Sequence, residues 1–454
     1  MKNRDKLIKI LIFLAFIAGI AIKLYYIHYT QVWERQHDVI GFGADEGQAA
    51  YIEYLLENRH FPDFDPRTKW GFFQPPLHHI LSAVMIYVST KLGANYGRAT
   101  ENIQFLTCFY MIAVTVIMAA IYLRASKGEK NKIETGQIGL FIALCVAGIH
   151  PIFTILSGSI NNDGLSLVLA VLALMLALSW YENPNIVRIV GVALAIGLSM
   201  MAKLTGGLVA VPIGILFLIK LVSVIKEALG GEKGELKNTV CQYIIFAIVV
   251  FPTGLWWTIR NMKLWNMPVS YIPGVGEIIP DSISTVQRLF DIRTNSIYCS
   301  LINSGADYDE YCIPLALLKT SIFGEWDFGT VSRWIKVFAI PLFVLAIALL
   351  TISVIATFYM TFSKNSELKL HYKIVLFGTW VTYLLAYISF AISYRNFSAQ
   401  DFRYGAICII CEGIYLGLFT ESIKSNVLKR IILFSSAAFG VCSVMVYFII
   451  GFKA

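Results

Sequence analysis

Residues 336–360 read KVFAIPLFVLAIALLTISVIATFYM, and no residue after Lys336 in this stretch is charged. A helix needs about 20 mainly apolar residues to cross the hydrocarbon core of a bilayer, and this stretch provides them. Comparable apolar runs recur along the whole chain. Because helices satisfy their own backbone hydrogen bonds inside lipid, the sequence predicts an all-α polytopic membrane protein. We expect about eleven transmembrane helices, over residues 7–27, 101–123, 136–150, 164–181, 188–202, 205–225, 239–259, 336–360, 374–393, 405–421 and 431–452.

The composition excludes several other classes of protein. Of the 454 residues 57% are hydrophobic and 15% are charged, whereas an ordinary soluble domain carries about 25% charged residues. Such a chain is neither disordered nor a coiled coil, and we expect no nucleic-acid partner. The net charge of +8 then reports mainly which loops face the cytoplasm, because cytoplasmic loops of membrane proteins are enriched in Lys and Arg.

Residues 77–92, LHHILSAVMIYVSTKL, decide the topology. As a full span they would give twelve helices and would place the basic loops 124–132 and 226–237 outside the cytoplasm. As a membrane-surface or re-entrant helix they leave eleven spans and keep both basic loops inside, which the positive-inside rule favours. We therefore predict an uncleaved first span, a cytoplasmic N-terminus and two long extracytoplasmic loops with juxtamembrane helices, 28–100 and 260–335.

The cysteines give little functional signal. Most lie in apolar runs, where they act as small buried hydrophobes. Cys299 and Cys312 both lie in the second outer loop, where a disulfide is chemically permitted. Cys408 and Cys411 form a CxxC spacing inside an apolar run, with no second Cys or His pair beside it, so no metal site is predicted from the cysteines.

The first outer loop contains an acidic pair, Asp45-Glu46, directly before an amphipathic segment. A carboxylate beside a membrane surface can act as a general base on an acceptor hydroxyl. The same residues also suit a structural role, because Asp45 followed by Gln48 matches a helix N-cap with a capping-box partner. Both interpretations stay open from the sequence.

A proline pair precedes the next candidates, in Gln74-Pro75-Pro76-Leu77-His78-His79. The prolines force an extended entry into the following helix and present Gln74, His78 and His79 near the outer interface. Either histidine is suited to bind a phosphate or a sugar hydroxyl. Adjacent residues on a helix point about 100° apart, so the two rings do not share one site and a metal pair is not expected.

Asp163 and Lys203 lie at the outer ends of apolar segments. Asp163 opens a helix and is explained by capping, or as an outward-facing acid with a function. A lysine deep in lipid costs about 2.5–3.5 kcal/mol on insertion scales. Lys203 therefore either extends to the interface or pairs with an anion such as a phosphate.

Two arginines also lie near the outer boundary, against the positive-inside bias. Arg260 follows two tryptophans of an interfacial belt, and Arg403 stands in Asp401-Phe402-Arg403-Tyr404. An anionic partner would explain both. Two acidic residues of the chain, Asp401 and Glu412, are alternative partners for Arg403 in place of an external anion, and the sequence does not choose among the three.

Together these motifs resemble the C-type superfamily of integral-membrane glycosyltransferases, and within it the branch of protein O-mannosyltransferases and lipid A aminoarabinose transferases. Their order and spacing match over roughly residues 1–270 and more weakly to about residue 410. Gln74 departs from the family pattern, in which an aromatic or charged residue is common. The motifs are Asp45-Glu46, Gln74-Pro75-Pro76-Leu77, Asn162-Asp163, Lys203-Leu204-Thr205-Gly206, Trp257-Thr258-Ile259-Arg260-Asn261 and Phe402-Arg403-Tyr404.

The resemblance implies a sugar transferase that uses a polyprenyl-phosphate donor on the extracytoplasmic face of the plasma membrane. Asp45 would be the catalytic base, with Glu46 assisting, in one inverting displacement. Asp163 and Gln74 would contact the sugar or orient the cations. No cofactor is certain, and although a divalent metal is compatible with the family, no residue pattern indicates one. The residues that would hold the donor phosphate are Lys203, Arg260, Arg403, His78 and His79.

The implied domains are a glycosyltransferase transmembrane module over 1–270, the second outer loop over 260–335 and C-terminal transmembrane helices over 336–454. The expected partners are a polyprenyl-phosphate-linked sugar, membrane lipid and a glycan, lipid or protein acceptor.

Three rival functions remain open at this point. The main alternative is a transporter or flippase of a lipid-linked sugar, but such proteins usually show internal repeats and charges at mid-membrane. The others are a ligase that transfers whole oligosaccharides and a non-catalytic assembly subunit.

Overall fold

The computed structural model describes residues 2–35, 39–127, 137–231, 233–269, 271–274, 279–294, 296–298 and 311–453, and all regular secondary structure in them is helical. This confirms the predicted all-α class. The α-helices are α1 (Lys2–Tyr29), α2 (Gly47–Asn58), α3 (Leu77–Lys91), α4 (Tyr96–Glu101), α5 (Ile103–Ala125), α6 (Gln137–Ala143), α7 (Pro151–Gly158), α8 (Asp163–Glu182), α9 (Ile186–Ala202), α10 (Ala210–Leu229), α11 (Lys233–Trp265), α12 (Thr285–Phe290), α13 (Ile313–Phe323), α14 (Ile335–Phe362), α15 (Leu370–Ser393), α16 (Ile407–Ser422) and α17 (Asn426–Lys453).

Shorter helical turns connect several of these helices. They are η1 (Pro66–Thr68), η2 (Leu144–Gly148, a π-helical turn), η3 (Leu204–Val209), η4 (Phe397–Gln400) and η5 (Phe402–Gly405).

The long helices provide the membrane spans. Within the described ranges eight helices are long and apolar enough to cross a bilayer, and ten if each of two bent pairs counts as one span. The shorter apolar helix α9 lies at the position of a further predicted span. Each of the predicted spans therefore coincides with a long helix, a bent pair or α9.

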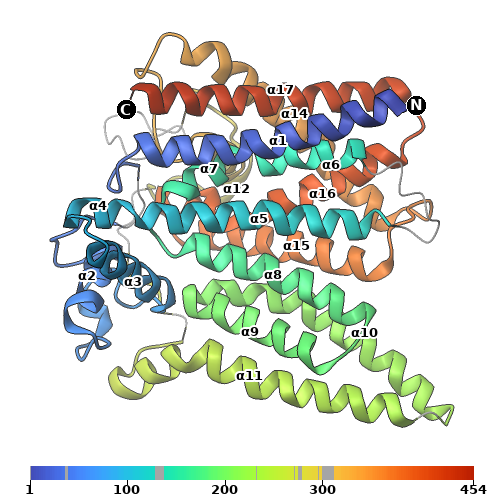
Figure 1. The fold of residues 1–454 in the computed structure, drawn as a ribbon, viewed down its shortest axis with the longest axis horizontal. Coiled ribbons are helices and arrows are strands. Elements are labelled where there is room, and N and C mark those ends of the chain that lie inside the picture. Colours follow the sequence, from blue (N-terminus) through green and yellow to red (C-terminus); the bar gives the residue numbers. More distant parts are fainter. Residues whose placement is uncertain are drawn as a thin grey trace.

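The two helices of the first outer loop lie outside the bundle. Figure 1 shows the long helices side by side, with α2 and α3 at one end and at a steep angle to them. Helix α3 covers the segment 77–92 up to Lys91, and its outward-facing Val84, Tyr87 and Val88 are exposed apolar residues. This arrangement agrees with the membrane-surface interpretation. Figure 1 also places the two ends of the chain at opposite ends of the bundle, as an odd number of crossings requires.

A broken helix crosses the middle of the bundle. Helix α6, the turn η2 and α7 form one apolar segment that bends by 49° before Pro151. A bend frees backbone carbonyls, which need a new donor inside lipid. Lys23 of α1 supplies it, because its fully buried Nζ donates to the carbonyl of Gly148 at 2.8 Å and to that of Gly19 at 3.1 Å.

The second outer loop is attached to the end of α15. The guanidinium of Arg395 donates to the carbonyls of Ile279, Pro280 and Ile283. Cys312, at the start of α13, is buried. Cys299 lies outside the described residues, and so does the predicted pairing with Cys312.

Candidate active site

Three charged side chains from distant parts of the sequence meet at the end of the bundle that also carries α2 and α3. Asp163 is the first residue of α8, Lys203 follows α9, and Arg403 lies in η5. Lys203 Nζ lies 2.5 Å from Asp163 Oδ1, and Arg403 Nε lies 3.8 Å from Asp163 Oδ2. The exposed fraction of the side chain is 14% for Lys203, 2% for Arg403 and 9% for Asp163, so the cluster is shielded from solvent.

Tyr404 joins the two cations. Its ring lies below Lys203 Nζ, which is 4.7 Å from the ring centroid, and its hydroxyl accepts a hydrogen bond of 2.7 Å from Arg403 Nη2. A cation over an aromatic face at this distance is attracted by the ring quadrupole. These four residues line a cavity of about 40 Å³ together with Ser166, Leu167, Ala170, Thr205, Gly206, Tyr383, Ala406 and Ile407.

The local sequence explains how Lys203 reaches this place. Its backbone is extended, with φ −153° and ψ 128°, so it separates α9 from η3. The amide of Asn162 donates to the Ala202 carbonyl at 2.8 Å and fixes that end of α9 against α8. Gly206 lies three residues later, in η3. A Cβ at this position would lie 2.5 Å from Ser166 Oγ and 2.8 Å from the Ser199 carbonyl, so only glycine fits between α8 and α9.

Arg403 is held by the acid two residues before it. Asp401 Oδ1 accepts the backbone amide of Arg403 at 2.6 Å and caps η5. The side chain of Arg403 points to Asp163, while Glu412 accepts the indole N–H of Trp380. The sequence left Asp401 and Glu412 open as partners of Arg403. In the structure Asp401 caps the backbone of η5, and Glu412 bonds to Trp380 instead.

Gln74 connects this cluster to the first outer loop. Its Oε1 accepts a hydrogen bond of 3.3 Å from the amide of Asn162, next to Asp163. The turn before it packs on the start of α2, because the Gly47 amide donates to the Trp70 carbonyl at 2.8 Å. At Gly71, φ is +86° and a Cβ would lie 2.9 Å from the backbone of Gly47, so glycine is required for this contact.

The acidic pair lies at the other end of that turn. Both Asp45 and Glu46 are exposed, and α2 begins at Gly47 with Glu46 as its cap residue and no side-chain cap bond. The capping-box interpretation of Asp45 with Gln48 is therefore wrong. Glu46 accepts the Trp70 amide at 3.4 Å, whereas Asp45 makes no hydrogen bond or ion pair with any described residue. The Asp45 carboxylate remains available to a substrate.

The two histidines are fully buried in α3. His78 Nε2 lies 2.8 Å from the Ile160 carbonyl, and His79 Nε2 bonds to Gln48 Oε1. Burial lowers the pKa of His78 to about 4 and that of His79 well below its usual value, so both rings are neutral at pH 7. They do not line the cavity with Lys203.

Arg260 supports the first outer loop from α11. Its guanidinium donates to the Pro62 carbonyl at 2.5 Å and to Asn261 Oδ1 at 2.9 Å, and it lies 5.0 Å from the ring of Trp257. It forms no ion pair with the Asp163 cluster in the part of the chain that the structure describes.

The structure thus brings together Asp163, Lys203, Arg403 and, through Asn162, Gln74. Tyr404 has no predicted role, although it follows Arg403 in the same motif; an aromatic residue next to an arginine is the signal that the sequence contains. Among the described residues no group of three or more His, Cys, Asp and Glu side chains forms a metal-binding cluster.

Comparison with known proteins returns matches by structure alone, because no family model and no curated protein matches the chain. ArnT from Cupriavidus metallidurans bound to undecaprenyl phosphate matches 97% of this chain and 78% of its own, at 13% identity and a TM-score of 0.38. The Archaeoglobus fulgidus oligosaccharyltransferase tethered with an acceptor peptide matches 97% of this chain and 55% of its own, at 12% identity and a TM-score of 0.49.

At these identities and TM-scores the likeness concerns the general arrangement of helices and does not place individual residues.

Proposed function

We propose that the protein is a membrane glycosyltransferase that moves a sugar from a polyprenyl-phosphate donor to an acceptor hydroxyl at the extracytoplasmic face of the plasma membrane. The observation that carries this proposal is the convergence of Lys203 and Arg403 on one small cavity. Two of the three charged residues that line this cavity are cationic. Cations kept in a shielded site at the end of a bundle suit an anionic headgroup that is presented from the membrane.

In this proposal Lys203 and Arg403 bind the donor phosphate, and Asp163 holds the two cations in place, one at each carboxylate oxygen. The arginine suits a phosphate because its planar guanidinium can donate two parallel hydrogen bonds. Gln74 contacts the sugar, since it lies next to Asn162 at the edge of the cluster. Arg260, His78 and His79 have no direct contact with the phosphate in this proposal, because their polar atoms already bond to Pro62, Ile160 and Gln48.

The proposed reaction is a single displacement at the anomeric carbon. Asp45 accepts the proton of the acceptor hydroxyl while the acceptor oxygen forms the new glycosidic bond. The bond from the anomeric carbon to the phosphate oxygen breaks, and its electron pair leaves with the polyprenyl phosphate. Lys203 and Arg403 stabilise the charge that develops on this leaving group. Attack from the face opposite the phosphate inverts the anomeric centre, and Glu46 orients the acceptor.

The test is incubation of the purified protein in lipid nanodiscs with radiolabelled polyprenyl-phosphate sugars and a membrane extract, followed by identification of the labelled product. We expect Asp45→Asn to reduce transfer by roughly 10²- to 10⁴-fold, as is typical for loss of a general base. Glu57→Gln is the matched control and should retain activity, because Glu57 is an exposed acid of α2, the helix that follows Asp45. Near-normal turnover by Asp45→Asn would overturn the mechanism.

A transporter would give a different result in the same system. Liposomes that contain the protein would move the labelled lipid-linked sugar across the bilayer without forming any transfer product. That outcome would replace the transferase by the flippase alternative.

A further inference from the structure

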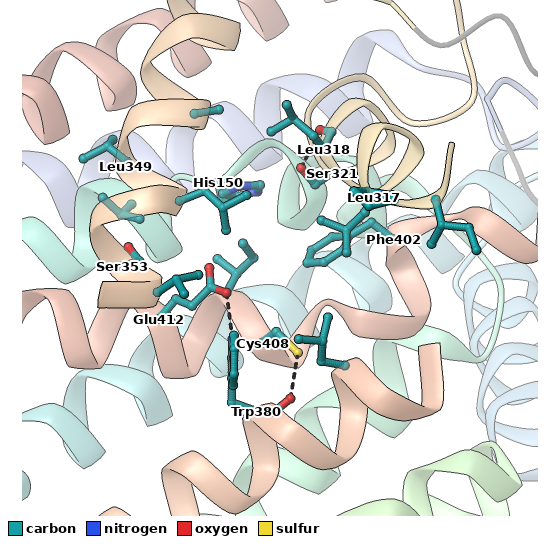
Figure 2. A pocket seen from close by; sticks show the side chains of 18 of the residues that line it. His150, Leu317, Leu318, Ser321, Leu349, Ser353, Trp380, Phe402, Cys408 and Glu412 are labelled. Atoms are coloured by element: carbon teal, nitrogen blue, oxygen red, sulfur yellow. Dashed lines mark hydrogen bonds between the residues drawn. The ribbon is translucent and has the colours of Figure 1, made fainter. Parts of the chain in front are cut away.

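A second and larger cavity lies inside the bundle, at the level where α13 meets α14, α15 and α16. Its volume is about 250 Å³, and most of its wall is hydrocarbon. Figure 2 shows Leu349 and Ser353 of α14, Trp380 of α15 and Glu412 of α16 around it, with Leu317 of α13 above. Phe402 lines this cavity, and the next residue, Arg403, lines the cavity of Lys203.

Two titratable groups line this apolar wall. Glu412 is 6% exposed, and one of its carboxylate oxygens accepts a hydrogen bond of 2.8 Å from Trp380 Nε1. His150 is 4% exposed, and its Nδ1 accepts the backbone amide of Ile152. The neutral ring therefore carries its hydrogen on Nε2.

Each group has one hydrogen-bonding atom left over. Neither Glu412 Oε2 nor His150 Nε2 forms a hydrogen bond with any residue that the structure describes. Buried polar groups normally have partners, so this pair indicates a ligand. Of these two groups, Glu412 offers an acceptor and His150 a donor, and the hydroxyls of Ser321 and Ser353 also line the cavity.

A hydroxyl group satisfies both, because it donates one hydrogen bond and accepts others. No Lys or Arg among the described residues lines this cavity, so a phosphate or other anion would lack a cation to pair with, and an ammonium group would face the N–H of His150. The surroundings restrict the rest of the ligand. Glu412, Ser353 and Trp380 lie well inside α16, α14 and α15, so the ligand must be soluble in the bilayer.

We propose that this cavity binds the hydroxyl end of a long-chain membrane alcohol, which enters between α14 and α15. The hydroxyl donates to Glu412 and accepts from His150 Nε2, and the hydrocarbon chain packs on the leucines of the wall. Leu350, Val354 and Leu384 of α14 and α15 are half-buried at its edge and provide the route to the lipid. This site is distinct from the donor-phosphate site and does not depend on the proposed transfer reaction.

The test is photolabelling of the full-length protein in nanodiscs with a diazirine-bearing primary alcohol, followed by mass spectrometry of the labelled peptides. Two probes of the same chain length serve as comparisons, a hydrocarbon without the hydroxyl and a fatty acid. We expect the alcohol to label peptides of α14, α15 and α16 roughly tenfold more than the hydrocarbon, which corresponds to loss of one hydrogen bond.

Variants separate recognition from general labelling. Glu412→Leu and His150→Leu should each reduce labelling by the alcohol, and Leu349→Trp should abolish it by filling the cavity. Thr420→Val is the matched control, because Thr420 is buried in the same helix and bonds only to the Leu416 carbonyl. If a leucine variant misfolds, Glu412→Gln keeps the shape and should still lower alcohol labelling, since an amide NH2 replaces one of the carboxyl oxygens.

Three outcomes would overturn the proposal. They are equal labelling by the alcohol and the hydrocarbon, preferential labelling by the fatty acid, and unchanged labelling of a folded Leu349→Trp variant.

Discussion

Lys203 and Arg260 are both cations at the outer boundary, but their surroundings differ. Lys203 Nζ meets one carboxylate oxygen and the face of Tyr404 beside an open cavity. The guanidinium of Arg260 is already engaged by the Pro62 carbonyl and Asn261. A cation that is free on one side can bind a phosphate without first breaking protein contacts.

We therefore predict that Lys203→Met weakens binding of the polyprenyl-phosphate sugar by roughly 10- to 100-fold. This change in affinity corresponds to the free energy of one hydrogen bond to a charged group. Arg260→Met should weaken binding less. Donor binding to purified protein, measured by titration with the labelled lipid, checks both. Monodisperse elution and an unchanged melting temperature are the controls for folding, and an equal or larger loss in Arg260→Met would contradict the assignment.

Individual site residues were predictable to different degrees. The sequence identified Asp163, Lys203 and Arg403 because a charge at the end of an apolar run is costly and needs a reason. Their mutual contact was not predictable, because it depends on how α8, α9 and η5 pack. The sequence also presented His78 as interfacial, whereas packing of α3 against the bundle buries it.

At the scale of elements, Gly206 decides whether η3 packs against α8 and α9. A Cβ there would meet Ser166 Oγ and the Ser199 backbone, whereas a Cβ on Gly214 of α10 would meet nothing within 4 Å. We predict that Gly206→Ala destabilises the protein by about 1–3 kcal/mol, the typical cost of overpacking. Gly214→Ala should be neutral or slightly stabilising, because alanine favours a helix.

Thermal unfolding in detergent, followed by tryptophan fluorescence, compares the two alanine variants. Transfer activity adds a second readout, since a shift of η3 displaces Lys203. A melting temperature of Gly206→Ala equal to that of Gly214→Ala would show that the close packing around η3 is not as described.

Helix α3 carries a pH dependence of its own. His78 Nε2 bonds to the Ile160 carbonyl and its buried Nδ1 has no partner among the described residues, so a proton there is unfavourable. The pKa falls to about 4 in the folded protein from an ordinary 6.5. Between these values the unfolded chain binds more protons, so stability is lost as the pH falls from 6.5 towards 4.

His78→Gln should reduce this loss, because the amide can still donate to Ile160 but does not titrate. The removed contribution amounts to about 3 kcal/mol over the whole interval, at 1.36 kcal/mol per pKa unit. Melting temperatures of both proteins across pH 4–7 provide the measurement. Parallel curves for the two proteins would exclude His78 as a source of acid sensitivity.

The elements themselves were largely predictable. Apolar runs located the spans because the bilayer requires about 20 such residues whatever the neighbours are. The break before Pro151 was not predicted at its true place, since the sequence suggested a span ending near residue 150. The structure continues through α7, and the bend is tolerated because Lys23, more than 100 residues earlier, binds the Gly148 carbonyl. Such a long-range partner leaves no local signal.

For the whole molecule, the decisive property is which end of the bundle faces the cytoplasm. Figure 1 places α2 and α3 at the end opposite to the N-terminus. The positive-inside rule assigns the basic N-terminal end to the cytoplasm. Asp45, the Asp163 cluster and Arg260 should then all lie on the extracytoplasmic side, where a lipid-linked sugar meets its acceptor.

We predict opposite accessibility for two introduced cysteines. Glu57 is exposed in α2, and Lys364 is exposed in the connection between α14 and α15. In intact cells a membrane-impermeant thiol reagent should label Glu57→Cys, whereas Lys364→Cys should react only after permeabilisation. The parent protein controls for its native cysteines. Labelling of both variants in intact cells would mean that the bundle crosses the membrane differently, and the cations at the mouth of α8 would then lose their access to an extracytoplasmic donor.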